Sequence, residues 1–160
     1  MLNVTLIYLG AKEEAFFRDA KDEYAKRLKK YCVFREKCLK PEFLPSNPSE
    51  NEIFAALAKE KAKILDAVPK GAYTVAMCVE GTELSSEKFA GIFENCANNG
   101  FSDVAFIIGS SFGLDESLKN ECRARVSMSK MTFAHSLAAV MLHEQIYRAF
   151  CILKGEKYHK

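Results

Sequence analysis

The stretch SMSKMTFAHSLAAVMLHEQIYRAF, residues 127–150, changes character part-way along. Its first ten residues are rich in hydroxyl groups and are typical of a strand end followed by a loop. From Ser136 onward the pattern is that of a long apolar helix with few strongly polar residues, among them Glu144 and Arg148. So apolar a helix predicts burial on more than one side, and the loop before it predicts a binding site.

Upstream of this stretch, β-rich segments alternate with helical ones. We expect strands at 2–9, 33–39, 73–79, 104–108 and 125–128. We expect helices at 13–31, 50–66, within 81–100, and at 115–122, before the long last helix. Ser49 and Glu52 have the spacing of a capping box at the start of the second helix. The alternation predicts one α/β domain, residues 1–160, with a mostly parallel sheet.

The first helix has an apolar stripe, and its opposite face is expected to be charged and exposed. The cations of that face are Lys21, Lys26, Arg27, Lys29 and Lys30. The formal net charge of the whole chain is only +2, which neither requires nor excludes a nucleic-acid partner. The distribution of the cations therefore matters more than their sum.

Composition also limits which classes of protein this chain can belong to. The six cysteines form no C-x-x-C pair and most lie in apolar segments, which favours buried thiols over disulfides or a metal site. The first residues are typical of a strand and not of a signal peptide, and charge interrupts the last helix, so no membrane span is expected. These features predict a cytoplasmic protein.

Ligands of parallel sheets bind beyond the carboxyl ends of the strands. The expected places are after Val79, Ile108 and Met128. Gly109 allows close approach of the backbone there. The same loop also contains G-x-S-x-G with Ser111, the pattern of a hydrolase nucleophile. That hydrolase interpretation is disfavoured because the next helix is expected to start about one turn too late.

The last turns of the chain contain further candidate groups. Glu144 and Arg148 have the spacing of a local ion pair on a helix. The terminal KGEKYHK, residues 154–160, combines cations with an aromatic ring, a combination suited to phosphate contact and base stacking. His135 is expected to cap the last helix, as most lone histidines at helix starts do.

Three segments taken together carry a family resemblance: MCVEGTELSSEKFA (77–90), FIIGSSFGL (106–114) and the stretch from 127 to the end. In this order and spacing the chain resembles the RlmH-type ribosomal RNA large-subunit methyltransferases of the SPOUT superfamily. YLGAKEEAFFRDAKDEYAKRLKKY (8–31) is similar to the opening of that family. The resemblance implies a C-terminal trefoil knot, a homodimer, S-adenosylmethionine as cofactor, and methylation of N3 of a pseudouridine in 23S rRNA of the assembled ribosome.

The resemblance also assigns residues. The cofactor-binding positions would be Met77, Gly109, Met128, Ser129, Lys130, Met131, Thr132 and Phe133. The RNA-binding positions would be Arg148, Lys154, Lys157, Tyr158, His159 and Lys160. N3 of the base has a proton that must leave before or during transfer. Either His135 or His159 takes it, with Arg148 as a further catalytic candidate, or the imide ionises in a positive site.

The chain departs from the family pattern at three positions. Ser110 stands where the family usually has Gly, Ala134 where it has Pro, and Ala139 where it typically has Arg. The third change removes a cation from the start of the last helix. A non-catalytic RNA-binding SPOUT relative is therefore the second interpretation, and a serine hydrolase using Ser111 is the third.

Overall fold

Five parallel strands form one sheet in the order β2-β1-β4-β3-β5 in the computed structural model, which describes residues 1–159. The strands are β1 (Asn3–Leu9), β2 (Val33–Leu39), β3 (Tyr73–Glu83), β4 (Asp103–Ile108) and β5 (Ala124–Ser127). The helices are α1 (Ala15–Leu28), α2 (Glu50–Ala67), α3 (Ser86–Asn98), α4 (Glu116–Glu121) and α5 (His135–Leu153). The predicted α/β class with a parallel sheet is confirmed. The trefoil knot stays a prediction.

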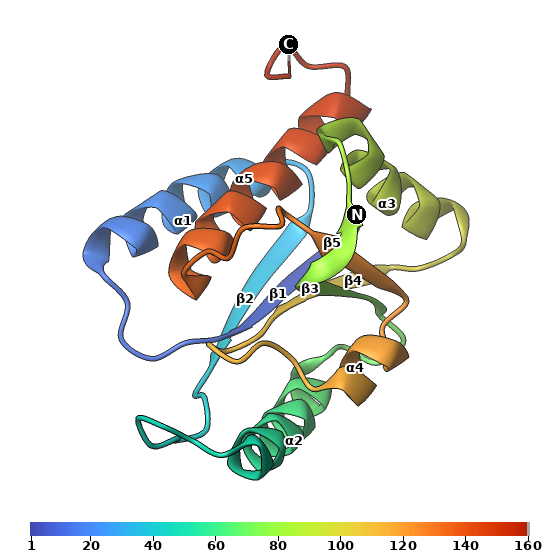
Figure 1. Ribbon diagram of the computed structural model, residues 1–160. Helices are drawn as coiled ribbons and strands as arrows, with labels where there is room; N and C mark the ends of the chain where they lie inside the picture. The colour runs from blue at the N-terminus through green and yellow to red at the C-terminus, as the bar shows by residue number, and fades with distance from the viewer. Residues whose placement is uncertain (160) are drawn as a thin grey trace.

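Helices cover both faces of the sheet (Figure 1). The first face is covered by α1, α3 and α5, and the second by α2 and α4. Side chains of β1 alternate between the two layers, as the two-residue repeat of a strand requires. Val4, Leu6 and Tyr8 pack in the core under α1, α3 and α5, whereas Ile7 and Leu9 pack under α2 and α4.

Local sequence signals placed the helix starts well. Ser49 Oγ accepts a hydrogen bond from Glu52 N at 3.2 Å, and Ser49 N donates to Glu52 Oε2 at 2.7 Å, which confirms the capping box. Asp115 caps α4, because its Oδ1 accepts from Ser117 N at 2.9 Å and Leu118 N at 3.2 Å. Both caps satisfy backbone donors that a helix start leaves unpaired.

The third strand differs from its predicted bounds. It continues past Val79, and Val126 of β5 pairs with Met77 and again with Thr82, so residues 78–81 leave the ladder. Gly81 explains how the strands stay close there: a Cβ at this position would lie 2.7 Å from the carbonyl carbon of Val126. Because Met77 pairs with Ile108, the last residue of β4, this irregularity lies at the carboxyl end of the sheet.

Lys21 does not lie on an exposed face of α1, so that prediction was wrong. Its side chain is 4% exposed and its Nζ lies 2.6 Å from Glu36 Oε1, 2.6 Å from Tyr8 OH and 3.1 Å from Glu13 Oε1. A lysine is buried only when partners satisfy its charge. Those partners come from β1, β2 and the segment before α1, and helix periodicity cannot reveal them.

His143 joins the same buried cluster from α5. Its side chain is fully buried, and its Nδ1 lies 2.7 Å from the carbonyl oxygen of Ala139. Its Nε2 lies 2.9 Å from Glu36 Oε2, an ion-pair distance without the alignment of a hydrogen bond. Burial alone would raise the pKa of the Glu36 carboxyl, and the close contacts of its oxygens with His143, Lys21 and Tyr8 lower it to about 2.

Within residues 1–159, none of the helices combines the length and the apolar composition that crossing a membrane requires.

Candidate functional site

A cavity of about 540 Å³ opens at the carboxyl ends of β3, β4 and β5. Its walls are three segments, 77–80, 108–114 and 128–135, with Lys119 and Ala138 between them. The three strand ends named from the sequence therefore converge on one site. Of the eight predicted cofactor-binding residues, Lys130 alone does not line this cavity.

The loop after β4 depends on its two glycines. A Cβ at Gly109 would lie 2.2 Å from the carbonyl oxygen of Gly113, a distance that no side chain tolerates. Gly113 has φ of 84°, and its N donates to Ser110 O at 2.8 Å. Gly109 is thus required first by the packing of the loop itself, and only secondarily by access of a ligand.

Ser110 connects this loop to the far layer of the fold. Its Oγ donates to Glu60 Oε2 at 2.8 Å, and Glu60 Oε1 accepts from the backbone N of Glu42 at 2.9 Å. Glu60 is 3% exposed, so these are the bonds that satisfy a buried carboxylate of α2. The serine that stands in place of the family's second glycine therefore has a structural partner in this chain.

The loop after β5 presents main-chain groups to the cavity. Ser127 Oγ donates to the carbonyl oxygen of Ser129 at 2.9 Å, and Ser129 Oγ accepts from Met131 N at 3.1 Å, which fixes the first turn of the loop. In the described part of the chain, the backbone N–H groups of Thr132 and Phe133 make no hydrogen bond. Unpaired donors in a cavity wall are available to a ligand.

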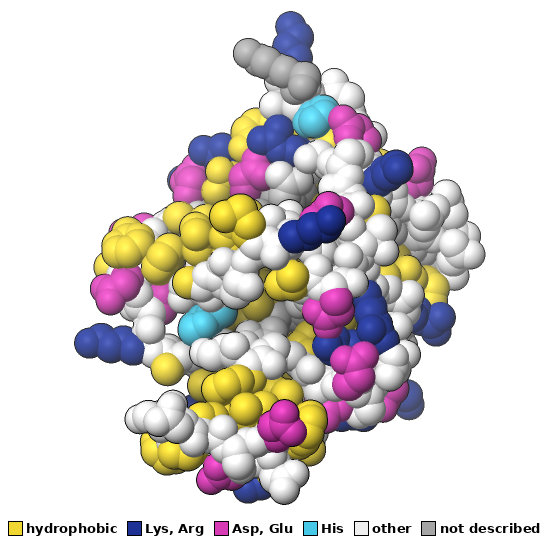
Figure 2. All heavy atoms as spheres, in the orientation of Figure 1, with side chains coloured by type: hydrophobic (Ala, Val, Ile, Leu, Met, Phe, Trp, Pro, Cys, Tyr) yellow, Lys and Arg dark blue, Asp and Glu magenta, His cyan; other side chains and the backbone are white. Residues whose placement is uncertain are grey.

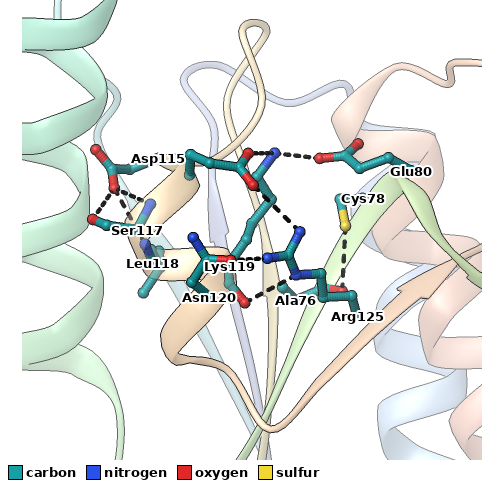
Figure 3. Close-up of polar contacts among 10 residues, drawn as sticks. Ala76, Cys78, Glu80, Asp115, Ser117, Leu118, Lys119, Asn120 and Arg125 are labelled. Atoms are coloured by element: carbon teal, nitrogen blue, oxygen red, sulfur yellow. Dashed lines mark hydrogen bonds and ion pairs between the residues drawn. The ribbon is translucent and has the colours of Figure 1, made fainter.

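Ion pairs hold segment 77–80 of the cavity wall in place (Figure 3). Lys119 Nζ contacts Glu80 at the β3 irregularity and lies 2.7 Å from Glu116 Oε2 of its own helix. Its hydrogen bond to Glu80 lowers the pKa of that carboxyl. Arg125 Nε donates to the carbonyl oxygen of Lys119 at 3.2 Å, which ties α4 to β5. Sequence reasoning missed Lys119, since nothing local separates it from other helix lysines.

His135 lies in the cavity wall as the first residue of α5. It does not cap the helix, because Ala134 occupies the cap position and no side chain bonds there. Its ring is close to the end of β1: a Cβ at Gly10 would lie 3.4 Å from His135 Cδ2 and 3.3 Å from the Tyr8 ring. Of the two predicted bases, His135 is the one that the structure brings to the cavity.

The other predicted catalytic and RNA-binding residues form a separate cluster near the end of α5. Arg148 pairs with Glu144, as its spacing predicted, and Tyr158 OH donates to Glu144 Oε1 at 3.1 Å. His159 Nε2 lies 2.7 Å from Glu87 Oε1, and its Nδ1 lies 3.5 Å from Arg148 Nη1. Thirteen residues of helix separate Arg148 from His135, about 20 Å at the α-helical rise.

The rest of the terminal segment is only partly described. Lys154 and Lys157 are exposed, whereas Lys160 lies outside the described residues. Main-chain and Ser85 hydrogen bonds, followed by the contact with His159, lower the pKa of Glu87 to about 2. Burial raises the pKa of Tyr158, and its bond to Glu144 acts in the same direction. The described part of this cluster is thus an ordered network of side chains.

The hydrolase interpretation gains no support from the geometry. Ser111 is exposed, and α4 begins only at Glu116, as the late cap indicated. Within residues 1–159 no side chain hydrogen-bonds to Ser111 as a base would. In the same residues no three or more His, Cys, Asp or Glu side chains are grouped to hold a metal. The six cysteines are free thiols; Cys32, Cys96 and Cys151 are buried as expected, whereas Cys38 is exposed.

Comparison with known proteins now identifies the family. The family model described as "Predicted SPOUT methyltransferase" matches residues 2–159. The chain belongs to the SPOUT methyltransferases. It is 42% identical to "Ribosomal RNA large subunit methyltransferase H 1" of Clostridium perfringens (strain SM101 / Type A), over 99% of this chain and 100% of that protein. It is 43% identical to "Ribosomal RNA large subunit methyltransferase H" of Clostridium beijerinckii, with the same coverage.

Solved structures agree on the SPOUT fold. A probable methylase family protein from Haemophilus influenzae Rd KW20 matches with a TM-score of 0.55 and 13% identity, over 99% of this chain and 70% of that chain. A putative methylase family protein from Neisseria gonorrhoeae matches with a TM-score of 0.54 and 14% identity, over 91% and 82%. At such identities the likeness concerns the fold alone.

Ala139, where the resemblance places an Arg, is fully buried in the core of this SPOUT chain. Its carbonyl oxygen faces His143 Nδ1, one turn further along α5. The imidazole of His143 on this part of α5 is directed at Glu36 and not at the cavity. Neither Lys130 nor Arg148, the nearest Lys and Arg on either side of Ala139 in the sequence, lines the cavity.

Proposed function

We propose that this chain is a cytoplasmic, homodimeric methyltransferase that uses S-adenosylmethionine to methylate N3 of a pseudouridine in 23S rRNA of the assembled ribosome. One observation supports this most: the loop 128–133, matched to the family's cofactor positions, lines a single cavity with Met77 and Gly109. The SPOUT match over residues 2–159 and the full-length relatives named as rRNA methyltransferases support the same proposal.

The cavity suits such a cofactor. Its volume lies within the roughly 300–1,000 Å³ of small-molecule sites, and its wall combines apolar side chains with unpaired backbone donors. The N–H groups of Thr132 and Phe133 would meet polar edges of the ligand, and Met77 and Met128 would contact its apolar surfaces. When bound, S-adenosylmethionine supplies an electrophilic methyl group on a sulfonium centre. The residues need only orient a nucleophile toward it.

The two predicted bases for removing the N3 proton lie in different parts of the structure. His135 lies in the cavity wall of its own chain. His159 and Arg148 lie about 20 Å along α5 from it, so one chain does not bring both clusters to one base. In the proposed homodimer, the terminal cluster of one copy approaches the cavity of the other. This would reunite the RNA-contacting residues with the cofactor.

Exposed apolar side chains near the cavity provide the surface for such a dimer. Figure 2 shows hydrophobic side chains gathered over the beginning of α1 and the neighbouring part of α5. The exposed fractions are 64% for Phe16, 46% for Phe112, 70% for Met131 and 39% for Leu137. Large apolar groups gathered on one surface are typical of an interface between subunits. The half-exposed Val140 and Met141 of α5 continue this surface.

The decisive experiment is methyl transfer from labelled S-adenosylmethionine to ribosomes that lack the modification, followed by mapping of the methylated nucleotide. Transfer to N3 of one 23S pseudouridine is expected. Cofactor binding without transfer to any ribosome preparation would instead favour the non-catalytic RNA-binding relative. His135→Gln and His159→Gln separate the candidate bases: the true base should lose kcat at unchanged cofactor affinity. If both variants keep the kcat of the wild type, the imide ionises without either histidine acting as a base.

A further inference from the structure

The cations of this chain are not paired evenly over its surface. On the α2 and α4 side three lysines pair with carboxylates, Lys61 with Glu121, Lys63 with Glu42 and Lys119 with Glu80, whereas the exposed Lys59 and Lys70 form no ion pair within residues 1–159. At the end of α1 the pattern differs. From residue 24 to residue 35 the sequence contains no acidic residue. Lys26 and Lys29 are exposed there and form no ion pair within residues 1–159.

The terminal segment adds cations to the same surface. We define the basic end as the exposed cations at the end of α1 and after α5. Its members are Lys26, Arg27, Lys29, Lys30, Lys154 and Lys157. Exposed carboxylates also lie there: Glu23 at 2.8 Å from Arg27 Nε, Glu156 at 3.2 Å from Lys30 Nζ, and Asp22 one helical turn before Lys26. The six cations outnumber them, whereas the net charge of the whole chain is only +2.

Aromatic packing makes the basic end a fixed surface. Tyr147 of α5 contacts Tyr24 of α1 at a centroid distance of 6.1 Å and Tyr158 of the terminal segment at 4.8 Å. Tyr31 stacks on Phe150 at 5.8 Å. These rings join the end of α1 to the segment after α5, so their cations are held together without needing a ligand. Figure 2 shows Lys and Arg side chains at this end of the molecule, near the C-terminus.

We propose that the basic end binds the phosphate backbone of rRNA at a distance from the cavity. This rests on the proposed function and extends it to α1, which neither motif nor family assignment had included. The α5 helix begins in the cavity wall at His135 and extends 19 residues, about 28 Å, to the terminal segment, and α1 packs beside it (Figure 1). Phosphate contacts at that distance position the RNA and add affinity, and they leave the target base to other residues.

Two variants of equal charge test the location. Lys26→Gln with Lys29→Gln removes the unpaired cations of the basic end. Lys59→Gln with Lys70→Gln removes two exposed cations of the α2 side that also form no ion pair within residues 1–159. We expect the first to raise KM for ribosomal substrate roughly tenfold, to lower the log–log salt slope of binding by about 1.5, and to preserve kcat and cofactor Kd. The second should match wild type.

The outcomes separate this inference from the proposed function. If both variants change KM and the salt slope equally, only total charge matters and the basic end is no site. If wild type transfers no methyl group, the proposed function fails, and the salt slope of binding to large ribosomal subunits still tests the surface. A photoreactive residue placed at Lys29 should crosslink to rRNA, with the same residue at Lys59 as control. Crosslinks from Lys29 to ribosomal proteins alone would overturn the proposal.

Discussion

Replacing Glu36 by Gln tests whether the buried charge cluster holds α1 and α5 on the sheet. The carboxylate faces Lys21 Nζ at 2.6 Å and His143 Nε2 at 2.9 Å, and these two side chains are 4% and 0% exposed. The amide keeps the shape but removes the negative charge. Lys21 then retains Tyr8 OH and one carboxylate, Glu13 at 3.1 Å, and His143 no longer faces a carboxylate.

Two independent estimates give the same magnitude. Removing one partner of a buried ion pair destabilises a protein by about 3–5 kcal/mol. The fall of the Glu36 pKa from its usual value near 4.5 to about 2 corresponds to about 3 kcal/mol of stabilisation. Because the folded-state pKa is the lower one, this stabilisation is complete above about pH 4.5 and is lost as the pH falls toward 2.

The assay is equilibrium unfolding in urea across pH 2–7, for wild type, Glu36→Gln and the exposed control Glu94→Gln. We expect Glu36→Gln to lose about 3 kcal/mol at pH 7, and the difference from wild type to shrink below pH 4.5 because the wild-type carboxyl becomes protonated. Glu94→Gln should change little at any pH. A loss under 1 kcal/mol at pH 7, or a difference independent of pH, would refute the reasoning.

Three further changes probe the cavity and the surface around it. Gly109→Ala places a Cβ 2.2 Å from Gly113 O, so we expect about 1–3 kcal/mol of destabilisation and weaker cofactor binding in calorimetry; unchanged values would contradict the loop geometry. Met141→Glu, at a half-exposed position of α5, should lower the mass measured by light scattering from dimer to monomer without unfolding the chain; a persistent dimer places the interface elsewhere. Lys119→Met frees Glu80 and should weaken cofactor binding several-fold, with Lys119→Arg close to wild type; equal affinities would show that the pair does not shape the wall.

The parts of the structure that local signals determine were predictable, and those that depend on distant contacts were not. The alternation of strands and helices along the chain, the capping box at Ser49 and the meeting of three strand ends follow from short patterns and the rules of parallel sheets. The extension of β3 depends on the fit of Gly81 against β5, and the burial of Lys21 depends on three partners from other segments. The separation of His159 from His135 depends on the direction in which α5 runs from the cavity.

The three walls of the cavity have a thermodynamic consequence. Segments 77–80, 108–114 and 128–135 are far apart in sequence and meet only when the sheet is assembled. A ligand held between them has no partial site to bind in the unfolded chain, so its binding free energy adds in full to the free energy of unfolding. At a ligand concentration one hundred times Kd, this is about 2.7 kcal/mol. The concentration of methyl donor would then affect the fraction of the protein that is folded, as well as the rate of methyl transfer.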